Sequence, residues 1–167
     1  MSNRNQTLSD VRLVAFDIDG VFTDGRFYIS NDGVESKTFH THDGFGVKQL
    51  LKAGLVVAII SGRESAAVDH RMIGLGIQHI IQGVSDKVAA FELLVKDLEI
   101  NEAQAVYVGD DVPDLPLLRR VGFSVAVSNA HDDVKAECDY TTVSAGGFGA
   151  VREVCDLVLQ AHQDSNN

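Results

Sequence analysis

Five short apolar runs recur along the chain, and stretches with helical periodicity separate them. Such nearly continuous runs are typical of parallel strands that are buried on both faces of a sheet. The predicted strands are residues 11–16, 55–60, 79–81, 105–108 and 123–127. The predicted helices are residues 47–53, 65–73, 87–98, 115–120, 131–137 and 150–162. This alternation predicts an α/β fold with a doubly wound parallel sheet, in which ligands bind at the carboxyl ends of the strands.

One segment departs from the alternation. Residues 27–29 and 35–41 have the pattern of two short strands, and the turn between them ends in Asp-Gly. A hairpin at this place follows the first strand and would project over the strand ends. We therefore predict a β-hairpin insertion at about residues 25–41, which serves as a flap over the site or as a contact between subunits; a plain insertion is the alternative.

Length and composition then limit the class of protein. The 167 residues with 45% apolar content predict one domain, residues 1–167, with a substantial core. A net charge of −10 argues against a nucleic-acid partner, because phosphate backbones are bound by clustered Lys and Arg. The apolar runs are too short to span a membrane, and residues 1–10 lack the apolar run of a secretory signal. Cys138 and Cys155 form no CxxC pair, so a reduced, cytoplasmic protein is expected.

Carboxylates gather at two predicted strand ends. Seventeen of the 24 acidic residues are Asp, and five of these follow the first and fourth strands. They are Asp17, Asp19, Asp110, Asp111 and Asp114. If the two strands are neighbours, the carboxylates converge, which is unfavourable unless a cation neutralises them. Ligation by oxygen alone suits Mg²⁺, so we predict a magnesium site.

Two further segments complete a phosphate site. Ser61 and Arg63 follow the second strand, and Lys87 stands at a predicted helix start. A hydroxyl and an ammonium beside bound Mg²⁺ provide what phosphoryl transfer requires, namely positioning and neutralisation of oxygen charge. Asp17 could then act as a nucleophile and form an aspartyl-phosphate. Arg63 could hold an oxyanion through two hydrogen bonds.

In this order the motifs resemble the haloacid dehalogenase superfamily of phosphatases. The matching segments are Asp17-x-Asp19, Ser61, Lys87 and the group from Gly109 to Asp114. The resemblance implies a Rossmann-like core in which Asp17 attacks phosphorus, while Asp19 protonates the leaving oxygen and later activates water. It also implies that Ser61 and Lys87 bind the phosphoryl group. The implied Mg²⁺ ligands are the Asp17 side chain, the Asp19 backbone carbonyl and Asp110, with Asp111 or Asp114 acting through water.

A narrower resemblance extends from Val11 to about Leu159. It is carried by residues 17–25 (DIDGVFTDG), 42–46 (HDGFG), 60–63 (ISGR) and 145–153 (AGGFGAVRE), which are similar to the family of 3-deoxy-D-manno-octulosonate 8-phosphate phosphatases. The resemblance implies an enzyme of lipopolysaccharide inner-core sugar biosynthesis that has no cap domain. It also implies a homotetramer, in which the hairpin and the C-terminal segment of one subunit help to close a neighbour's site.

The implied substrate is a phosphorylated eight-carbon sugar acid. The positions that match the family's substrate contacts are Asp19, His40, Thr41, His42, Asp43, Gly44, Lys48, Ser61, Arg63, Arg71 and Lys87. Lys48 stands near the start of the predicted helix 47–53, where the helix dipole disfavours a cation; either a bound ligand or exposure to solvent would explain it. The sequence departs from the family's pattern at His42, where Arg is usual, and at Phe148, where a basic residue is frequent. A phosphatase for a nine-carbon sugar acid 9-phosphate therefore stays open.

Two other classes of protein are weighed against a phosphatase. A receiver-like signalling domain also gathers carboxylates, a hydroxyl and a Lys around Mg²⁺ on a parallel sheet. Asp19 argues against it, because a slowly switching receiver has no use for an acid/base group two residues after its phosphorylated Asp. The order of Lys87 before the Asp110 motif argues against it as well. A catalytically silent structural subunit would not need all four motifs.

Overall fold

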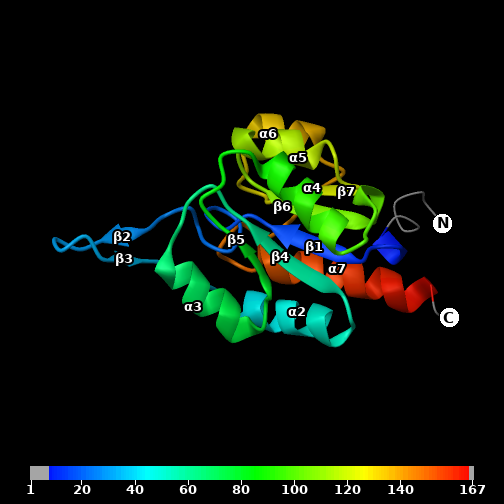
Figure 1. Cartoon of the computed structure of the whole chain (residues 1–167), viewed down its shortest axis with the longest axis horizontal. Helices are drawn as coiled ribbons and strands as arrows, with labels where there is room; N and C mark the ends of the chain where they lie inside the picture. The colour runs from blue at the N-terminus through cyan, green and yellow to red at the C-terminus, as the bar shows by residue number, and fades with distance from the viewer. Residues whose placement is uncertain (1–7, 166–167) are drawn as a thin grey trace.

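A six-stranded parallel sheet forms the centre of the computed structural model, which describes residues 8–165 (Figure 1). The strands lie in the order β5-β4-β1-β6-β7-β8. Their bounds are β1 Leu13–Phe16, β4 Val56–Ile60, β5 His79–Ile81, β6 Ala105–Gly109, β7 Phe123–Ala126 and β8 Tyr140–Thr141. The predicted α/β, Rossmann-like fold is confirmed, with β8 as an additional short edge strand. Residues 1–7 and 166–167 of the predicted domain lie outside the described residues.

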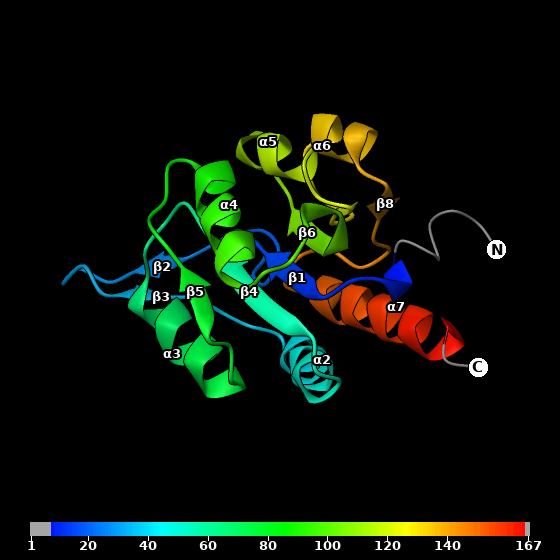
Figure 2. The same ribbon diagram turned by 45° about the vertical axis from the view of Figure 1, so that its right-hand side comes forward.

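Helices cover both faces of this sheet (Figure 2). On one face lie α2 (Thr41–Lys52), α3 (Ala66–Leu75) and α7 (Ala150–Ser165). On the other lie α4 (Lys87–Asp97), α5 (Leu115–Leu118) and α6 (Asp132–Glu137). All four residues of β1 are fully buried between the layers, which explains their continuous apolar sequence. Among residues 8–165, no helix is long and apolar enough to cross a membrane.

The position of β1 brings the predicted motifs together. It pairs in parallel with β4 on one side and with β6 on the other. Since parallel strands end at the same edge of a sheet, Asp17, Ser61 and Asp110 all emerge at that edge. The neighbouring strands required for convergence of the carboxylates are therefore present.

The predicted hairpin is also confirmed, and it projects from the body beside the strand ends (Figure 1). Its two antiparallel strands, β2 (Tyr28–Ile29) and β3 (Glu35–Ser36), are shorter than expected. Most of the side chains of Tyr28 and Ile29 are exposed, at 65% and 62%. The hairpin therefore adds little to the core of its own chain, and its stability depends on other contacts.

Helix α2 begins at Thr41, six residues before the predicted start. The prediction was wrong because Gly44 and Gly46 weaken the helical pattern. The fold stabilises these residues as helix in two ways: the His40 ring accepts the His42 N–H at the N-cap, and Gly46 lets α7 approach closely. A Cβ at Gly46 would lie 3.0 Å from that of Cys155. Lys48 consequently lies in the middle of α2, so the expected conflict with the helix dipole does not arise.

The segment Ala145–Gly149 packs directly on the loop that follows β1. Gly147 N–H donates to the carbonyl of Val21 over 3.1 Å. A Cβ at Gly146 would lie only 1.7 Å from the carbonyl oxygen of Gly20. This close approach requires glycine, and it places the C-terminal glycine-rich segment behind the loop that carries Asp19.

We expect Gly146→Ala to displace the loop after β1, because the new methyl group overlaps the Gly20 carbonyl. Overpacking of this kind costs about 1–3 kcal/mol, measured as the free energy of unfolding in urea. Gly74→Ala is the matched control, because Gly74 is an exposed residue of α3 and there is open space around its Cβ position. That change should stabilise the protein by about 0.5–1 kcal/mol. Equal stability of the two variants would contradict the assigned contact.

Candidate active site

A pocket of about 320 Å³ opens at the carboxyl edge of the sheet. It is formed by the segments after β1, β4 and β6 together with the start of α4 and the base of the hairpin. Its lining residues are Asp17, Asp19, Gly25, Ser61, Gly62, Arg63, Lys87, Asp110, Asp111, Pro113 and Asp114. The pocket thus contains every residue from the four superfamily motifs for which a role was predicted.

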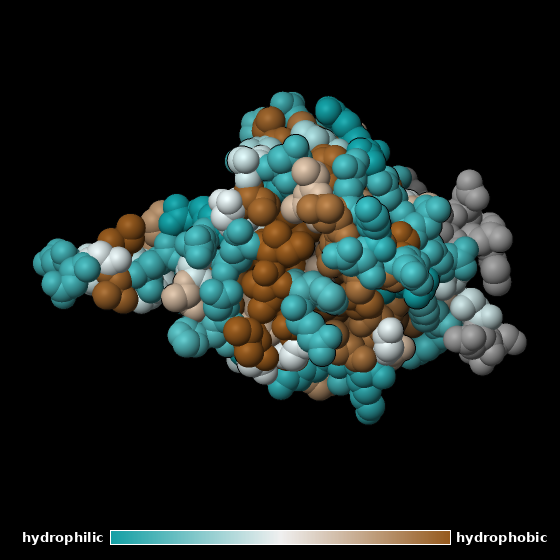
Figure 3. Space-filling view, in the orientation of Figure 1, coloured by the Kyte–Doolittle hydropathy of each residue, from teal (hydrophilic) through white to brown (hydrophobic). Residues whose placement is uncertain are grey.

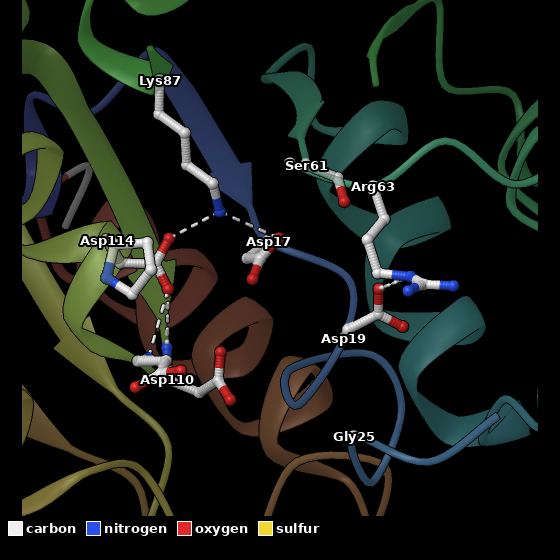
Figure 4. Close-up of a pocket in the computed structure, with 11 residues that line it drawn as sticks. Asp17, Asp19, Gly25, Ser61, Arg63, Lys87, Asp110 and Asp114 are labelled. Atoms are coloured by element: carbon white, nitrogen blue, oxygen red, sulfur yellow. Dashed lines mark hydrogen bonds and ion pairs between the residues drawn. The ribbon is translucent and has the colours of Figure 1, made fainter. Parts of the chain in front are cut away.

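Lys87 is the central cation of the pocket (Figure 4). Its Nζ lies 3.0 Å from Asp17 Oδ1 and 2.7 Å from Asp114 Oδ1. It also donates to the hydroxyl of Tyr107 over 3.1 Å. Burial opposes the charge on Lys87, but the two carboxylates outweigh burial and raise the pKa of its ammonium above the usual range. Lys87 is therefore charged and fixed in place.

The carboxylates are crowded even with Lys87 among them. Burial, followed by the charge of Asp114, raises the pKa of Asp17 to about 6 despite its ion pair with Lys87. Burial, followed by the charges of Asp17 and Asp114, raises the pKa of Asp110 to about 8. Gly20, at φ +91°, leaves room for the Asp110 carboxylate beside the loop after β1, since a Cβ there would lie 1.9 Å from Asp110 Oδ2. The single ammonium of Lys87 therefore does not balance the negative charge of these carboxylates.

Asp114 is saturated with hydrogen bonds from its own chain. Its Oδ1 accepts from Lys87 and from the Tyr107 hydroxyl, the latter over 2.7 Å. Its Oδ2 accepts from the backbone N–H groups of Asp110 and Asp111 over 3.0 and 3.3 Å. Asp111, by contrast, is exposed and accepts the N–H of Val112. Asp114 therefore orients Lys87 and the loop that carries Asp110.

Three groups of this site were missed from the sequence. Tyr107 lies in the middle of an apolar strand, which hid the role of its hydroxyl. Lys37, at the base of the hairpin, forms an ion pair with Asp19, and Glu35 lies 2.6 Å from Arg63. A signal for the last two existed, because residues two apart on an extended segment face the same side.

Seven predicted substrate contacts lie outside the pocket lining. They are His40, Thr41, His42, Asp43, Gly44, Lys48 and Arg71. Five of them form the N-cap and first turn of α2, and Arg71 lies on α3 close to Gly44. Asp43 is only 1% exposed, and its Oδ1 accepts the N–H of Arg152 in the first turn of α7. In this chain Asp43 thus joins the N-terminal ends of two helices.

The two positions that depart from the narrower family also lie away from the pocket. His42 packs its ring edge-on against His40, with 4.7 Å between the ring centroids. Phe148 is 65% exposed in the glycine-rich segment before α7. Neither residue is in contact with the carboxylate cluster, so these departures leave the pocket around Asp17 unchanged.

The donor set fits a divalent cation. Asp17, Asp110 and Asp114 each offer an oxygen within 4.8 Å of the others. The hydrogen bonds of Asp114 make it the least available of the three, whereas Asp17 and Asp110 repel each other. These carboxylates can be ionised together only if positive charge is added. Mg²⁺ supplies such charge and prefers carboxylate oxygens as ligands.

Comparison with known proteins identifies the same superfamily that the sequence motifs resemble. Residues 73–154 match the family model of haloacid dehalogenase-like hydrolases. The 3-deoxy-D-manno-octulosonate 8-phosphate phosphatase of Escherichia coli is 47% identical over 152 residues, which cover 91% of this chain and 81% of that protein.

Two solved structures superpose closely on this chain. The Moraxella catarrhalis 3-deoxy-D-manno-octulosonate 8-phosphate phosphatase, in complex with magnesium, phosphate and KDO, has a TM-score of 0.95 at 43% identity. The superposition covers 99% of this chain and 95% of that one. The cobalt-bound Haemophilus influenzae phosphatase has a TM-score of 0.92 at 39% identity, covering 96% and 94%.

The fold and the pocket define a Mg²⁺-dependent hydrolase of the haloacid dehalogenase type. Within that class, the chain belongs to the family of 3-deoxy-D-manno-octulosonate 8-phosphate phosphatases. Both resemblances found in the sequence are thereby confirmed.

The raised pKa values predict how stability depends on pH and Mg²⁺. Asp17 and Asp110 hold protons more tightly when folded, so their stabilising contribution is complete below the ordinary value of 3.8. It is lost as the pH rises through about 6 and about 8. We expect the metal-free protein to melt at a lower temperature at about pH 8.5 than at about pH 5, and Mg²⁺ to raise the melting temperature more at the higher pH.

Thermal unfolding in chelator and in excess Mg²⁺ measures both effects. Asp110→Asn should remove most of the response to Mg²⁺, whereas Asp133→Asn, which alters an exposed carboxylate on α6, should leave it unchanged. A Mg²⁺ response that is the same at both pH values, or that survives in Asp110→Asn, would contradict the site.

Proposed function

We propose that this protein hydrolyses 3-deoxy-D-manno-octulosonate 8-phosphate to the free sugar acid and phosphate, in lipopolysaccharide inner-core sugar biosynthesis. The observation that carries the proposal is the convergence of Asp17, Asp19 and Lys87 in one pocket, in a chain 47% identical to a phosphatase of that name. The residue roles below follow from that pocket and from the motifs.

The phosphoryl group is held by the cations and the hydroxyl of the pocket. Lys87 and Ser61 lie on either side of Asp17 in the lining, and we assign them to the phosphoryl oxygens (Figure 4). Arg63 stands at the mouth, where its guanidinium can donate to a further anionic oxygen. Asp17, the Asp19 carbonyl and Asp110 would hold Mg²⁺, with Asp111 acting through water and Asp114 positioning the loop. When bound, Mg²⁺ neutralises charge on the carboxylates and on the phosphoryl oxygens.

In the first step an Asp17 oxygen bonds to phosphorus while the bond from phosphorus to the sugar oxygen breaks. Lys87 holds Oδ1 of Asp17, which fixes the carboxylate and leaves Oδ2 outside that ion pair. For this step Asp19 must carry a proton when the substrate is bound; it gives that proton to the departing sugar oxygen, which leaves as a hydroxyl group of the sugar acid. The product on the enzyme is an aspartyl-phosphate at Asp17.

In the second step water attacks phosphorus and passes a proton to Asp19. The bond from phosphorus to the Asp17 oxygen then breaks, inorganic phosphate leaves, and both carboxyl groups return to their starting state. Asp19 lies in the pocket lining on the loop after β1, within reach of both reactions. Its two successive roles distinguish this site from a receiver-like domain, and the comparisons identify an enzyme family.

Substrate choice is tested with a panel of phosphorylated sugars. We expect Mg²⁺-dependent phosphate release from the eight-carbon sugar acid 8-phosphate, and slower release from a nine-carbon sugar acid 9-phosphate and from neutral sugar phosphates. Asp17→Asn should abolish turnover and keep the fold, because the amide is a poor nucleophile of the same shape. Equal rates on the eight- and nine-carbon acids would reject the narrow substrate assignment, and residual turnover by Asp17→Asn would reject the nucleophile.

We also infer a homotetramer in which the hairpin contacts neighbouring subunits. Hydrophobic groups are visible along the projecting hairpin and support this (Figure 3). Tyr28, Ile29 and Val34 are each more than 60% exposed. Apolar groups exposed together in this way mark interaction sites.

The predicted contacts on α2 and Arg71 remain proposals for the distal part of the substrate. A cytoplasmic location is supported by the free thiols of Cys138 and Cys155.

Replacing Ile29 and Val34 together by Ser should dissociate the tetramer, because it removes the apolar surface of the hairpin. Sedimentation velocity measures the mass. Leu93→Ser alters an equally exposed apolar residue on α4 and should leave the assembly intact. A monomeric wild-type protein would reject the proposal.

A further inference from the structure

The hairpin delivers a buried ammonium to the active site. The side chain of Lys37, just beyond β3, is 0% exposed. Its Nζ forms an ion pair with Asp19 Oδ1, lies 3.7 Å from Glu35 Oε1 and lies 5.8 Å from the centroid of the Phe27 ring. Burial of an ammonium costs free energy unless carboxylates lie close to it. Here Asp19 and Glu35 are those carboxylates.

Glu35 fixes the strand from which Lys37 extends. Its Oε1 accepts from the hydroxyl of Ser65 and its Oε2 from Arg63, each over 2.6 Å. Ser65 occupies the N-cap position of α3, yet its side chain makes no capping hydrogen bond. The hydroxyl donates to the hairpin instead. Glu35 thus anchors the hairpin to the start of α3, although the tip of the hairpin projects freely.

The carboxylate of Asp19 is held through these contacts. Its oxygens lie against Lys37 on the hairpin and, at 3.7 Å, against Nε of Arg63. Lys37 and Arg63 both lie outside the loop that carries Asp19, so the direction of the carboxylate depends on the hairpin and on the segment after β4. The Phe27 ring covers these ion pairs, and its centroid lies 4.1 Å from the guanidinium carbon of Arg63.

We propose that Lys37 is a positioning residue for the reaction, which aims the Asp19 carboxylate at the departing sugar oxygen and at the attacking water. The proposal rests on the phosphatase function assigned above. Packing alone would not require a charge at this position, since an apolar side chain of the same length would fill the space without a desolvation penalty. The hairpin is accordingly a component of the site within its own chain, in addition to its exposed apolar surface.

A double-mutant cycle separates positioning from a general structural effect. Lys37→Met should lower kcat about 10- to 100-fold with little change in KM, because misplacement of a catalytic group by about 1 Å has an effect of that size. Asp19→Asn alone should lower kcat about 10²–10⁴-fold. In the Asp19→Asn enzyme, Lys37→Met should cause almost no further loss, since there is no acid/base group left to position.

Three controls make the outcome decisive. Rates are normalised to the folded fraction from circular dichroism, and Lys52→Met, an exposed change in the last turn of α2, should leave kcat unchanged. Lys37→Gln keeps a donor at similar reach and should lose less than Lys37→Met. Losses that multiply in the double variant, or equal losses in the Gln and Met variants, would overturn the proposal.

The cycle is run with p-nitrophenyl phosphate as well as with the sugar acid phosphate. If the wild-type enzyme hydrolyses only the aryl phosphate, the substrate assignment fails, while the cycle on the aryl phosphate still tests Lys37 through the attacking water, because nitrophenolate leaves without a proton. If the wild-type enzyme hydrolyses both and the losses multiply, the positioning role fails and the proposed function stands.

Discussion

The ion pairs of Lys87 are the interaction on which the rest of the site depends. Three carboxylates meet at the carboxyl edge of the sheet, and one buried ammonium stands between two of them. Without it, the buried carboxylate of Asp17, the proposed nucleophile, would face the neighbouring carboxylates with no ammonium between them. With it, the cluster still carries excess negative charge; burial together with this charge raises the pKa of Asp110 to about 8, and the excess creates the demand for Mg²⁺. A net acidic protein can thereby bind an anionic substrate.

Glycine residues allow the loops to approach closely enough for that interaction. Gly20 brings the loop after β1 against Asp110, and Gly146 brings the C-terminal segment against Gly20. Gly109 leaves room for the Asp114 side chain, whose Cβ would lie 2.7 Å from an added methyl group. The glycine-rich sequence before α7 therefore supports the catalytic loop from behind. Its place in the sequence, more than 120 residues after Asp17, conceals this contact.

The hairpin combines two roles that are usually separate. Its base carries charged side chains that reach Asp19 and the start of α3, and its outer part exposes apolar side chains. The proposed assembly through the outer part would hold the base in position. It would thereby couple quaternary structure to the geometry of the Asp19 carboxylate.

The sequence by itself determined the sheet, the order of its motifs and the strand ends at which they lie, because burial on both faces requires continuous apolar runs. It could not determine where α2 begins, since the first turn with its glycines at 44 and 46 is stabilised as helix by the His40 N-cap and by packing against other helices. It also could not reveal Tyr107 as a partner of the site, because the hydroxyl lies within an apolar strand and meets Lys87 only through the parallel pairing of β1 and β6. For Lys37 the alternation along the hairpin placed its side chain on the same side as Glu35, but only the fold of the hairpin brings it to Asp19. The sequence therefore predicted which groups gather at the strand ends, and the tertiary structure decided what holds them in place.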